Sequence, residues 1–209
     1  MRLVKKFQYQ EIYVMRRTRL IAALLALAIA GCSAVWAQDA KPKPVPKPQP
    51  SPKASVMQRI GTDTDITINY NRPGVKGRKV WGDLVPYGMA PANQYAKNPF
   101  PWRGGANETT VIEFSKPVKI KGNSLPAGKY GLHFIPSEKD WTMIFSKNST
   151  GWGSFAYSQA EDALRITVTP VKAPFTEWLE YGFEKLSDTG AIGYLQWEEL
   201  KVPFEINIE

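Results

Sequence analysis

Residues 129–146, "KYGLHFIPSEKDWTMIFS", decide the fold class of this chain. In the first seven residues, Tyr130, Leu132 and Phe134 occupy every second position, which is the pattern of a β-strand. The segment "PSEKD" then turns the chain into a second apolar run, "WTMIFS". We therefore expect a protein built from short strands joined by tight turns.

The same pattern recurs along the chain, punctuated by Gly, Pro and Asn. No helical periodicity lasts longer than a turn or two, and "SQAEDA" (158–163) favours one helical turn at most. Nine or ten short strands at this spacing predict a single antiparallel β-sandwich or jelly-roll-like domain with very little helix. Further strands are expected at 65–70, 109–114, 117–120, 164–169, 175–183, 192–198 and 203–209, with "KGN" (121–123) as a hairpin turn.

Residues 1–37 have the pattern of an export signal. A basic stretch, "MRRTRL", begins at Met15, the expected true start, and an apolar run of 11 residues follows at 20–30. A bilayer span needs about 20 apolar residues, so this segment is typical of a secretory signal peptide. Residues 38–54 are expected to be a linker rich in Pro and Lys, because closely spaced prolines disfavour helix and sheet. The folded domain is then residues 55–209.

Two cleavage sites are compatible with this leader. "IAGC" resembles a lipoprotein box, in which Cys32 would carry a lipid anchor, whereas "VWA" before Gln38 resembles an ordinary cleavage site. The first predicts a domain tethered to a membrane through lipid alone, and the second a free periplasmic or secreted domain. Both predict an exported protein of the periplasm or cell envelope. Cys32 is the single cysteine, so no disulfide is expected.

The net charge of +8 comes from residues before the expected domain. Residues 54–209 contain 17 basic and 17 acidic side chains, since the excess lies in the leader and linker. A nucleic-acid-binding domain needs a basic face, so nucleic acid is not an expected partner.

Several kinds of chemistry lack the residues they need. A zinc site with several nitrogen or sulfur ligands is not expected, because His133 is the single histidine and is expected to be structural. There is no "GxSxG" motif and no phosphate-binding glycine motif. "GTDTD" (61–65) is the best local candidate for calcium, but an ordinary turn before a strand is the favoured interpretation. We expect no metal and no cofactor.

The longest stretch without strand character is 87–107, and loops of that length are often functional. It ends in "PWRGGANE", where the glycines permit positive φ and Asn107 favours a turn. Glu108 has no role in such a turn, so we expect it to pair with an arginine and close one end of the sandwich. The candidate ligand-binding residues are Arg78, Trp102, Arg103, Asn107 and Glu108.

Six tryptophans lie in the expected domain. Trp141 and Trp197 fall within strand patterns and are expected in the core, with Trp178 as a further candidate. Trp81, Trp102 and Trp152 lie beside glycines in loops. Such residues are either lids over the open end of a sandwich, the favoured interpretation, or platforms on which sugars stack.

The chain resembles the exported bacterial domain-of-unknown-function family DUF2911 over about residues 55–208. The resemblance rests on ordered blocks that include "RPGVKGRKVWGDLVPYG", "WRGGANETT", "LPAGKYGL" and "WTMIF". It implies a secreted or envelope protein, and it carries over no established reaction, substrate or cofactor. The family pattern runs almost directly from "LVPYG" to "WRxGANE", with Arg-Thr-Gly more usual than "RGG". The insertion at 89–101 therefore either gates the site or shows that its surroundings tolerate bulk, and it should be dispensable for folding.

Two functional interpretations remain open. The first is a non-catalytic envelope module that binds a polar ligand, a glycan or another envelope protein. The alternative is a hydrolase-like enzyme with Glu108 as general base, supported by Arg103 or Arg78 and by a second carboxylate from Asp162 or Glu113. Alternation along the strand puts Glu108 and Glu113 on opposite faces, which weakens the hydrolase interpretation. No catalytic residue is assigned.

Overall fold

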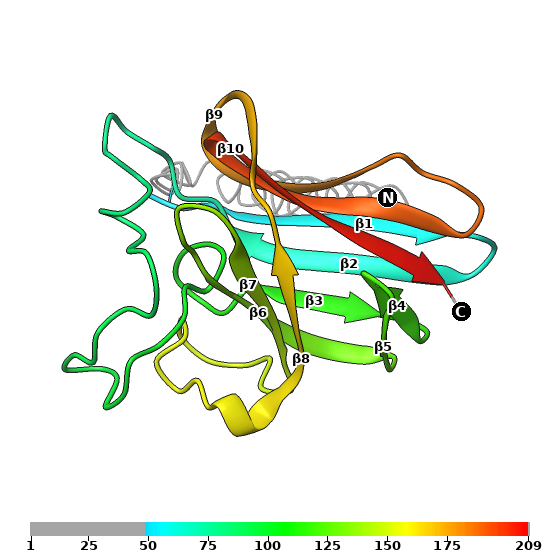
Figure 1. The fold of residues 1–209 in the computed structure, drawn as a ribbon, viewed down its shortest axis with the longest axis horizontal. Coiled ribbons are helices and arrows are strands. Elements are labelled where there is room, and N and C mark those ends of the chain that lie inside the picture. Colours follow the sequence, from blue (N-terminus) through cyan, green and yellow to red (C-terminus); the bar gives the residue numbers. More distant parts are fainter. Residues whose placement is uncertain (1–48, 209) are drawn as a thin grey trace, which may run out of the picture. The chain divides into compact units, whose positions relative to one another are not determined.

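The computed structural model describes residues 49–208, so the leader, Cys32 and most of the expected linker lie outside it. The described chain forms ten strands in two antiparallel sheets, ordered β1-β2-β3-β6-β7-β8 and β5-β4-β10-β9 (Figure 1). This confirms the all-β, sandwich-like fold. The strands are β1 (Lys53–Ile60), β2 (Thr64–Asn71), β3 (Val111–Phe114), β4 (Val118–Ile120), β5 (Asn123–Leu125), β6 (Gly128–Ile135), β7 (Trp141–Ser146), β8 (Asp162–Val168), β9 (Val171–Glu184) and β10 (Gly190–Ile208), with a single turn of 3-10 helix, η1 (Gln159–Glu161).

The turns follow the sequence chemistry closely. "PSEKD" joins β6 to β7, and Phe134 pairs with Met143 across that hairpin. Lys121 and Gly122 both have positive φ and join β4 to β5, as expected for "KGN". Residues 61–63 form the turn between β1 and β2, in agreement with the turn interpretation of "GTDTD".

One strand replaces the two that were expected near the C-terminus. β10 runs without interruption from Gly190 to Ile208, although strands were predicted at 192–198 and 203–209. Its pairing with β9 shifts register on both sides of Glu198, which has a φ of 57°. A β-bulge bends a strand without ending it, so the break in alternation is a bulge and not a loop.

The first strand was not expected. β1 begins at Lys53, inside the segment assigned to the linker, and pairs with β2 along its whole length, from Lys53 opposite Asn71 to Ile60 opposite Thr64. It is an edge strand whose side chains alternate between exposed and half-buried, with Ile60 alone fully buried. Its apolar pattern is therefore weak, as is typical of a strand that covers a sheet edge.

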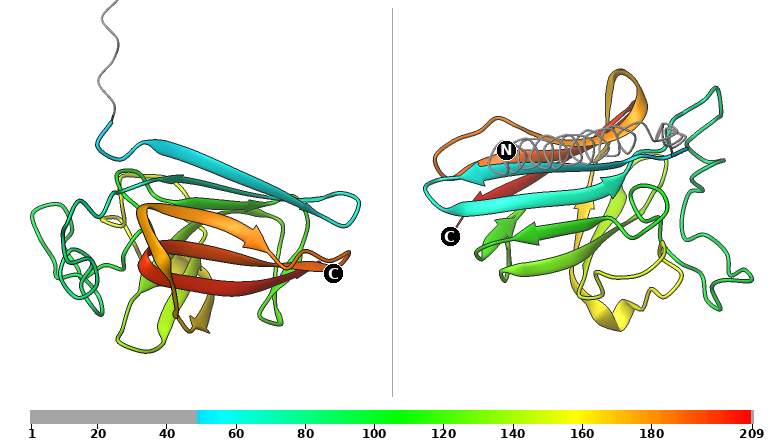
Figure 2. Two further views of the ribbon diagram at one scale, coloured as in Figure 1. Left: turned by 90° about the horizontal axis from the view of Figure 1, so that it is seen from above. Right: turned by 180° about the vertical axis from the view of Figure 1, so that it is seen from behind.

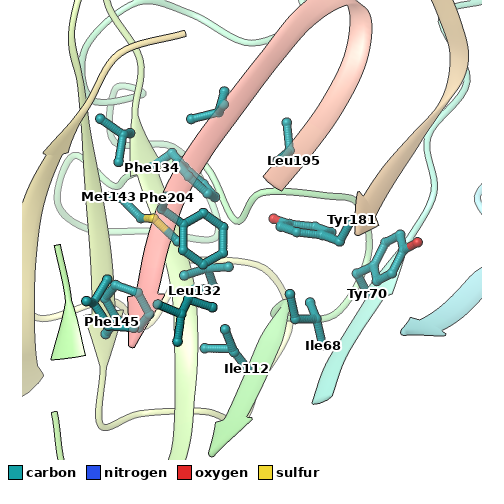
Figure 3. Close-up of a cluster of buried hydrophobic side chains, with 14 of the residues drawn as sticks. Ile68, Tyr70, Ile112, Leu132, Phe134, Met143, Phe145, Tyr181, Leu195 and Phe204 are labelled. Carbon is teal, nitrogen blue, oxygen red and sulfur yellow. The ribbon is translucent and has the colours of Figure 1, made fainter. Parts of the chain in front are cut away.

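The core lies between the two sheets. In Figure 1 β10 crosses in front of the larger sheet. In the view from behind, β1 and β2 of the larger sheet lie in front of β10 (Figure 2). Figure 3 shows the buried side chains that meet there, including Ile68, Leu132 and Phe145 from the larger sheet and Tyr181, Leu195 and Phe204 from the smaller. Burial of this apolar surface is the main stabilising contribution to the fold.

Two long loops meet beside the start of β3. One connects β2 to β3 (residues 72–110) and extends from one end of the sheets (Figure 1), and the other follows β7 (residues 147–158). An isolated antiparallel bridge between Glu108 and Trp152 joins the two loops. These loops carry the candidate functional residues.

Candidate functional site

The segment 101–110 is fixed to both sheets. Trp102 exchanges two backbone hydrogen bonds with Phe134 of β6, of 2.8 and 2.7 Å. Gly104 has a φ of 60°, and a Cβ at that position would lie 2.7 Å from the Phe134 ring. Tyr181 of β9 donates a hydrogen bond of 2.8 Å to the Gly104 carbonyl. The expectation of a left-handed glycine is therefore met at Gly104, where no other residue fits.

Asn107 and Glu108 hold the beginning of β1. Asn107 has a φ of 58°, and its side-chain amide donates to the Ser51 carbonyl at 3.4 Å. The Glu108 carboxylate lies 2.9 Å from Lys53 Nζ and accepts a hydrogen bond of 2.9 Å from the Asn71 amide. The hydrogen bond from Lys53 is the main cause of the lowered pKa of Glu108. These two residues therefore tie the first strand to the sheet.

The expected pairing of Glu108 with an arginine is wrong. Its partner is Lys53, and the Glu108 side chain is 40% exposed. Arg78 lies elsewhere in the same loop and donates to the carbonyls of Gly74 at 2.6 Å and Val75 at 3.1 Å. The partner of Glu108 depends on which basic residue the fold brings close to it. That residue is Lys53, the first residue of β1, and this strand was not predicted. The five candidate residues therefore do not converge on one cleft.

Arg103 has a different environment. Its Nη1 donates to the Asn107 carbonyl at 2.9 Å, and its guanidinium lies 5.4 Å from the centre of the Phe155 ring. A Cβ on Gly153 would lie 2.7 Å from Cζ of Arg103, so glycine at 153 lets the guanidinium lie against the backbone. Burial lowers the pKa of Arg103, which stays far above neutrality for a guanidinium. Within residues 49–208, Arg103 forms no ion pair.

An aromatic depression surrounds this guanidinium. Its volume is about 630 Å³, and its lining residues, which define the Arg103 hollow, are Tyr95, Arg103, Trp152, Phe155 and Ala156. Tyr95 and Trp152 are 68% and 60% exposed. Tyr95 stacks on Phe155 with 5.5 Å between ring centres and an angle of 26°. The sequence singled out Trp152 and Arg103, but it contains no local signal for Phe155, and Tyr95 belongs to the insertion.

A second depression of about 300 Å³ adjoins the Arg103 hollow. It shares Arg103 and Phe155 and is also lined by Trp102, Phe100 and Leu84. Phe100 meets Phe155 edge to face, with 5.2 Å between ring centres. The insertion at 89–101 therefore builds walls of both depressions.

The glycine-flanked tryptophans divide between the two expected roles. Trp81 and Trp102 lie in a cluster with the buried core residues Trp141 and Trp197, and 4.9 Å separates the ring centres of Trp81 and Trp141. These two are lids that complete the core. Trp152 is exposed at the Arg103 hollow and is the one that can serve as a platform.

Comparison with known families gives a match that covers most of the described chain. The family model described as "Protein of unknown function (DUF2911)" matches residues 51–206. The chain belongs to DUF2911. No curated protein and no solved structure matches this DUF2911 chain.

A buried pair lies beneath the second loop of the DUF2911 domain. His133 is 3% exposed, and its Nδ1 lies 2.8 Å from Ser154 Oγ. Burial, followed by the charge of Arg103, lowers the pKa of His133 to about 4, so the imidazole is neutral at pH 7. A cavity of about 20 Å³ beside the pair, also lined by Thr109 and Tyr157, has the size of one water molecule. Because His133 and Ser154 are both buried, the hydrogen bond between them ties the loop that follows β7 to β6.

The carboxylates named for a hydrolase lie apart in this DUF2911 domain. Glu113 faces Lys129 at 3.3 Å, and Asp162 bonds Arg165 at 3.0 Å and Tyr157 at 2.8 Å. The lowered pKa of Glu108 makes it a weaker base than an ordinary glutamate. Across residues 49–208, no cluster of three or more His, Cys, Asp and Glu side chains is placed to hold a metal. The same residues contain no helix with the length and apolarity needed to span a bilayer.

Proposed function

We propose that this DUF2911 protein is an exported, non-catalytic module of the cell envelope that binds a glycan in the Arg103 hollow. One observation carries the proposal. Two large aromatic side chains, Tyr95 and Trp152, are more than half exposed and line the same depression as a guanidinium that has no carboxylate partner within residues 49–208. Exposed aromatic groups gathered in a depression are a common mark of a binding site.

The chemistry of such a depression suits sugars. One face of a pyranose ring presents C–H groups, which pack on the electron-rich face of an aromatic ring. The hydroxyl groups around the ring then need hydrogen-bond partners, and guanidinium N–H groups supply them. Tyr95, Trp152 and Arg103 together offer both kinds of contact.

The Tyr95 ring and the backbone of Trp152 are held in place before any ligand arrives. Tyr95 is stacked on Phe155, and the backbone of Trp152 is bridged to Glu108. Thr109 reinforces this connection, because its hydroxyl donates to the Gly153 carbonyl at 2.6 Å. Preorganised side chains lose little conformational entropy on binding, which favours affinity.

The proposed location follows from the leader and linker of the sequence. A signal peptide would export the domain, and Cys32 or ordinary cleavage would decide whether it is tethered. A neutral domain has no general attraction to nucleic acid. A glycan of the envelope is thus the polar ligand that such a domain would meet.

Titration calorimetry with a panel of oligosaccharides, acidic and neutral, tests this function. Wild-type protein should bind at least one of them, and Trp152→Ala and Tyr95→Ala should each weaken that binding about tenfold or more. Phe175→Ala is the matched control, because Phe175 is 56% exposed on β9 and does not line the Arg103 hollow. Equal affinity for all four proteins, or binding of an envelope protein but of no sugar, would contradict the proposal.

A further inference from the structure

We propose that the ligand of the Arg103 hollow is an acidic glycan, and that Arg103 binds the carboxylate of a uronic acid or similar sugar. This inference rests on the proposed function and specifies its ligand class. It begins from the arginines of the domain. Of the five in residues 49–208, Arg72 and Arg103 are half-buried, and Arg59, Arg78 and Arg165 are exposed.

The two half-buried arginines differ in their partners. Arg72 faces Glu180 at 3.6 Å and donates to the Leu179 carbonyl at 2.9 Å. Arg103 faces no carboxylate among residues 49–208 and makes one hydrogen bond, to Asn107. A half-buried charge without a counter-ion is destabilising, so such an arrangement favours an anion supplied from outside.

The guanidinium of Arg103 keeps donors available. Arginine has five N–H groups, and within the described chain Nη1 alone has an acceptor, the Asn107 carbonyl. Arg103 lines both adjoining depressions, so a ligand in either can reach it. Contacts with Phe155 and Gly153 hold the guanidinium plane, which suits bidentate recognition of a carboxylate.

The Arg103 hollow carries one positive charge, which matches a sugar ring with one carboxylate. Arg103 is the one charged residue among those that line the Arg103 hollow, and the other walls are Tyr95, Trp152, Phe155 and Ala156. The neighbouring His133 is buried and neutral at pH 7, so it adds no second positive charge. A sugar carboxylate beside a stacked pyranose ring satisfies the cation and the aromatic walls together.

The test uses a defined trigalacturonate and its carboxyl-reduced, neutral counterpart, measured by titration calorimetry on the folded domain. Wild-type protein should bind the acidic trisaccharide about ten- to a hundredfold more tightly than the neutral one. Arg103→Gln should abolish that preference, because it removes the charge that recognises the carboxylate and weakens the acidic trisaccharide more than the neutral one. Arg103→Lys should retain part of it, because it keeps the charge and loses the planar fork. Arg78→Gln, an exposed arginine outside the hollow, is the control and should behave as wild type.

The outcomes distinguish a failure of the acidic-glycan inference from a failure of the proposed glycan binding. If Trp152→Ala loses binding while Arg103→Gln keeps the full acidic preference, the hollow binds glycans but Arg103 does not recognise their acid, and the inference is wrong. If a sulfated trisaccharide binds at Arg103 and the uronate does not, the carboxylate assignment is wrong. If neither trisaccharide binds and Trp152→Ala changes nothing in the wider panel, both proposals fail. Melting temperatures near wild type for both Arg103 variants ensure that folded proteins are compared.

Discussion

The guanidinium carbon of Arg103 lies 5.4 Å from the centre of the Phe155 ring. This contact connects two loops that are far apart in sequence, the β2–β3 loop and the loop that follows β7. Tyr95 packs on the same Phe155 ring, so two separate parts of the β2–β3 loop meet one aromatic side chain. Cation–π contact also stabilises the charge of Arg103, which pairs with no carboxylate in the part of the chain that the structure describes. Phe155 is thus the residue around which the Arg103 hollow is assembled.

Glu108→Ala should be moderately destabilising, mainly because it leaves the buried Asn71 amide without its acceptor, a loss of about 1–2 kcal/mol. The carboxylate is exposed and pairs with a lysine that is 76% exposed, and ion pairs of this kind contribute little. Asp63→Ala is the matched control, because it removes another exposed pair, that of Asp63 with Lys116. In a thermal scan Glu108→Ala should melt a few degrees below Asp63→Ala, because Glu108 also accepts a hydrogen bond from the buried Asn71 amide. A much larger loss of stability for Glu108→Ala would mean that this carboxylate is essential for holding β1 against the β2–β3 loop.

Gly104→Ala should be strongly destabilising. The positive φ of Gly104 and the nearby Phe134 ring both oppose a Cβ, and the expected loss is about 3 kcal/mol or more. Gly122 has a φ of 80°, and no atom lies within 4 Å of the position that a Cβ would take there. Gly122→Ala should therefore lose only about 1 kcal/mol, from backbone strain. Chemical denaturation of both variants measures the difference, and equal losses would refute the packing argument.

Stability should fall as the pH is lowered from 7 to 5. The pKa of His133 is about 4 in the folded domain and about 6.5 when unfolded, so the unfolded chain binds more protons in this window. The stabilisation is complete above about pH 6.5 and is lost towards pH 4, with a change of about 2 kcal/mol by pH 5. The charged group facing the imidazole is Arg103, and the Tyr157 ring beside it has its pKa raised to about 12, so neither titrates here.

Denaturant titrations at pH 5, 6 and 7 check this dependence. His133→Gln should flatten it, because glutamine does not titrate in this range. A wild-type protein equally stable at all three values, or a variant that keeps the full slope, would show that His133 is not the responsible group.

Shortening the insertion should spare the fold and weaken glycan binding. Ala90 and Phe100 exchange two backbone hydrogen bonds, of 2.8 and 3.0 Å, so an Asn-Gly turn in place of residues 91–99 can close the loop. Loop length affects stability only logarithmically, although the buried Ala96 is lost. The unfolding midpoint should shift by a few degrees, and glycan affinity should fall as in Tyr95→Ala. Collapse of the fold would instead make the insertion part of the core.

The sequence predicted the central strands of the sheets better than the edge strand β1. Alternation of Tyr130, Leu132 and Phe134 predicted β6, because side chains on one face of a strand recur at every second residue. β1 was missed because an edge strand is half exposed, and its apolar residues do not stand out. The bulge at Glu198 interrupts alternation without ending β10, and no residue pattern distinguishes that from a turn.

The candidate site was predicted in part. Local chemistry identified Gly104 and Asn107 as turn residues and placed Arg103 beside the unusual loop. The partners of Arg103 could not be found in this way, since Phe155 lies in another loop and meets it through the tertiary fold. The same reason explains Glu108, whose partner Lys53 is brought close by a strand that the sequence did not predict.

The most direct test of the central claim is a two-dimensional ¹⁵N–¹H NMR titration of the domain with trigalacturonate. Each tryptophan gives one indole N–H signal, and the Arg103 Nε–H gives a signal of its own. We expect the signals of Trp152 and Arg103 to shift together with a single saturation curve. The indole signal of Trp178, which does not line the Arg103 hollow, should stay in place. Saturable shifts confined to other residues, or no shifts at millimolar sugar, would contradict the account.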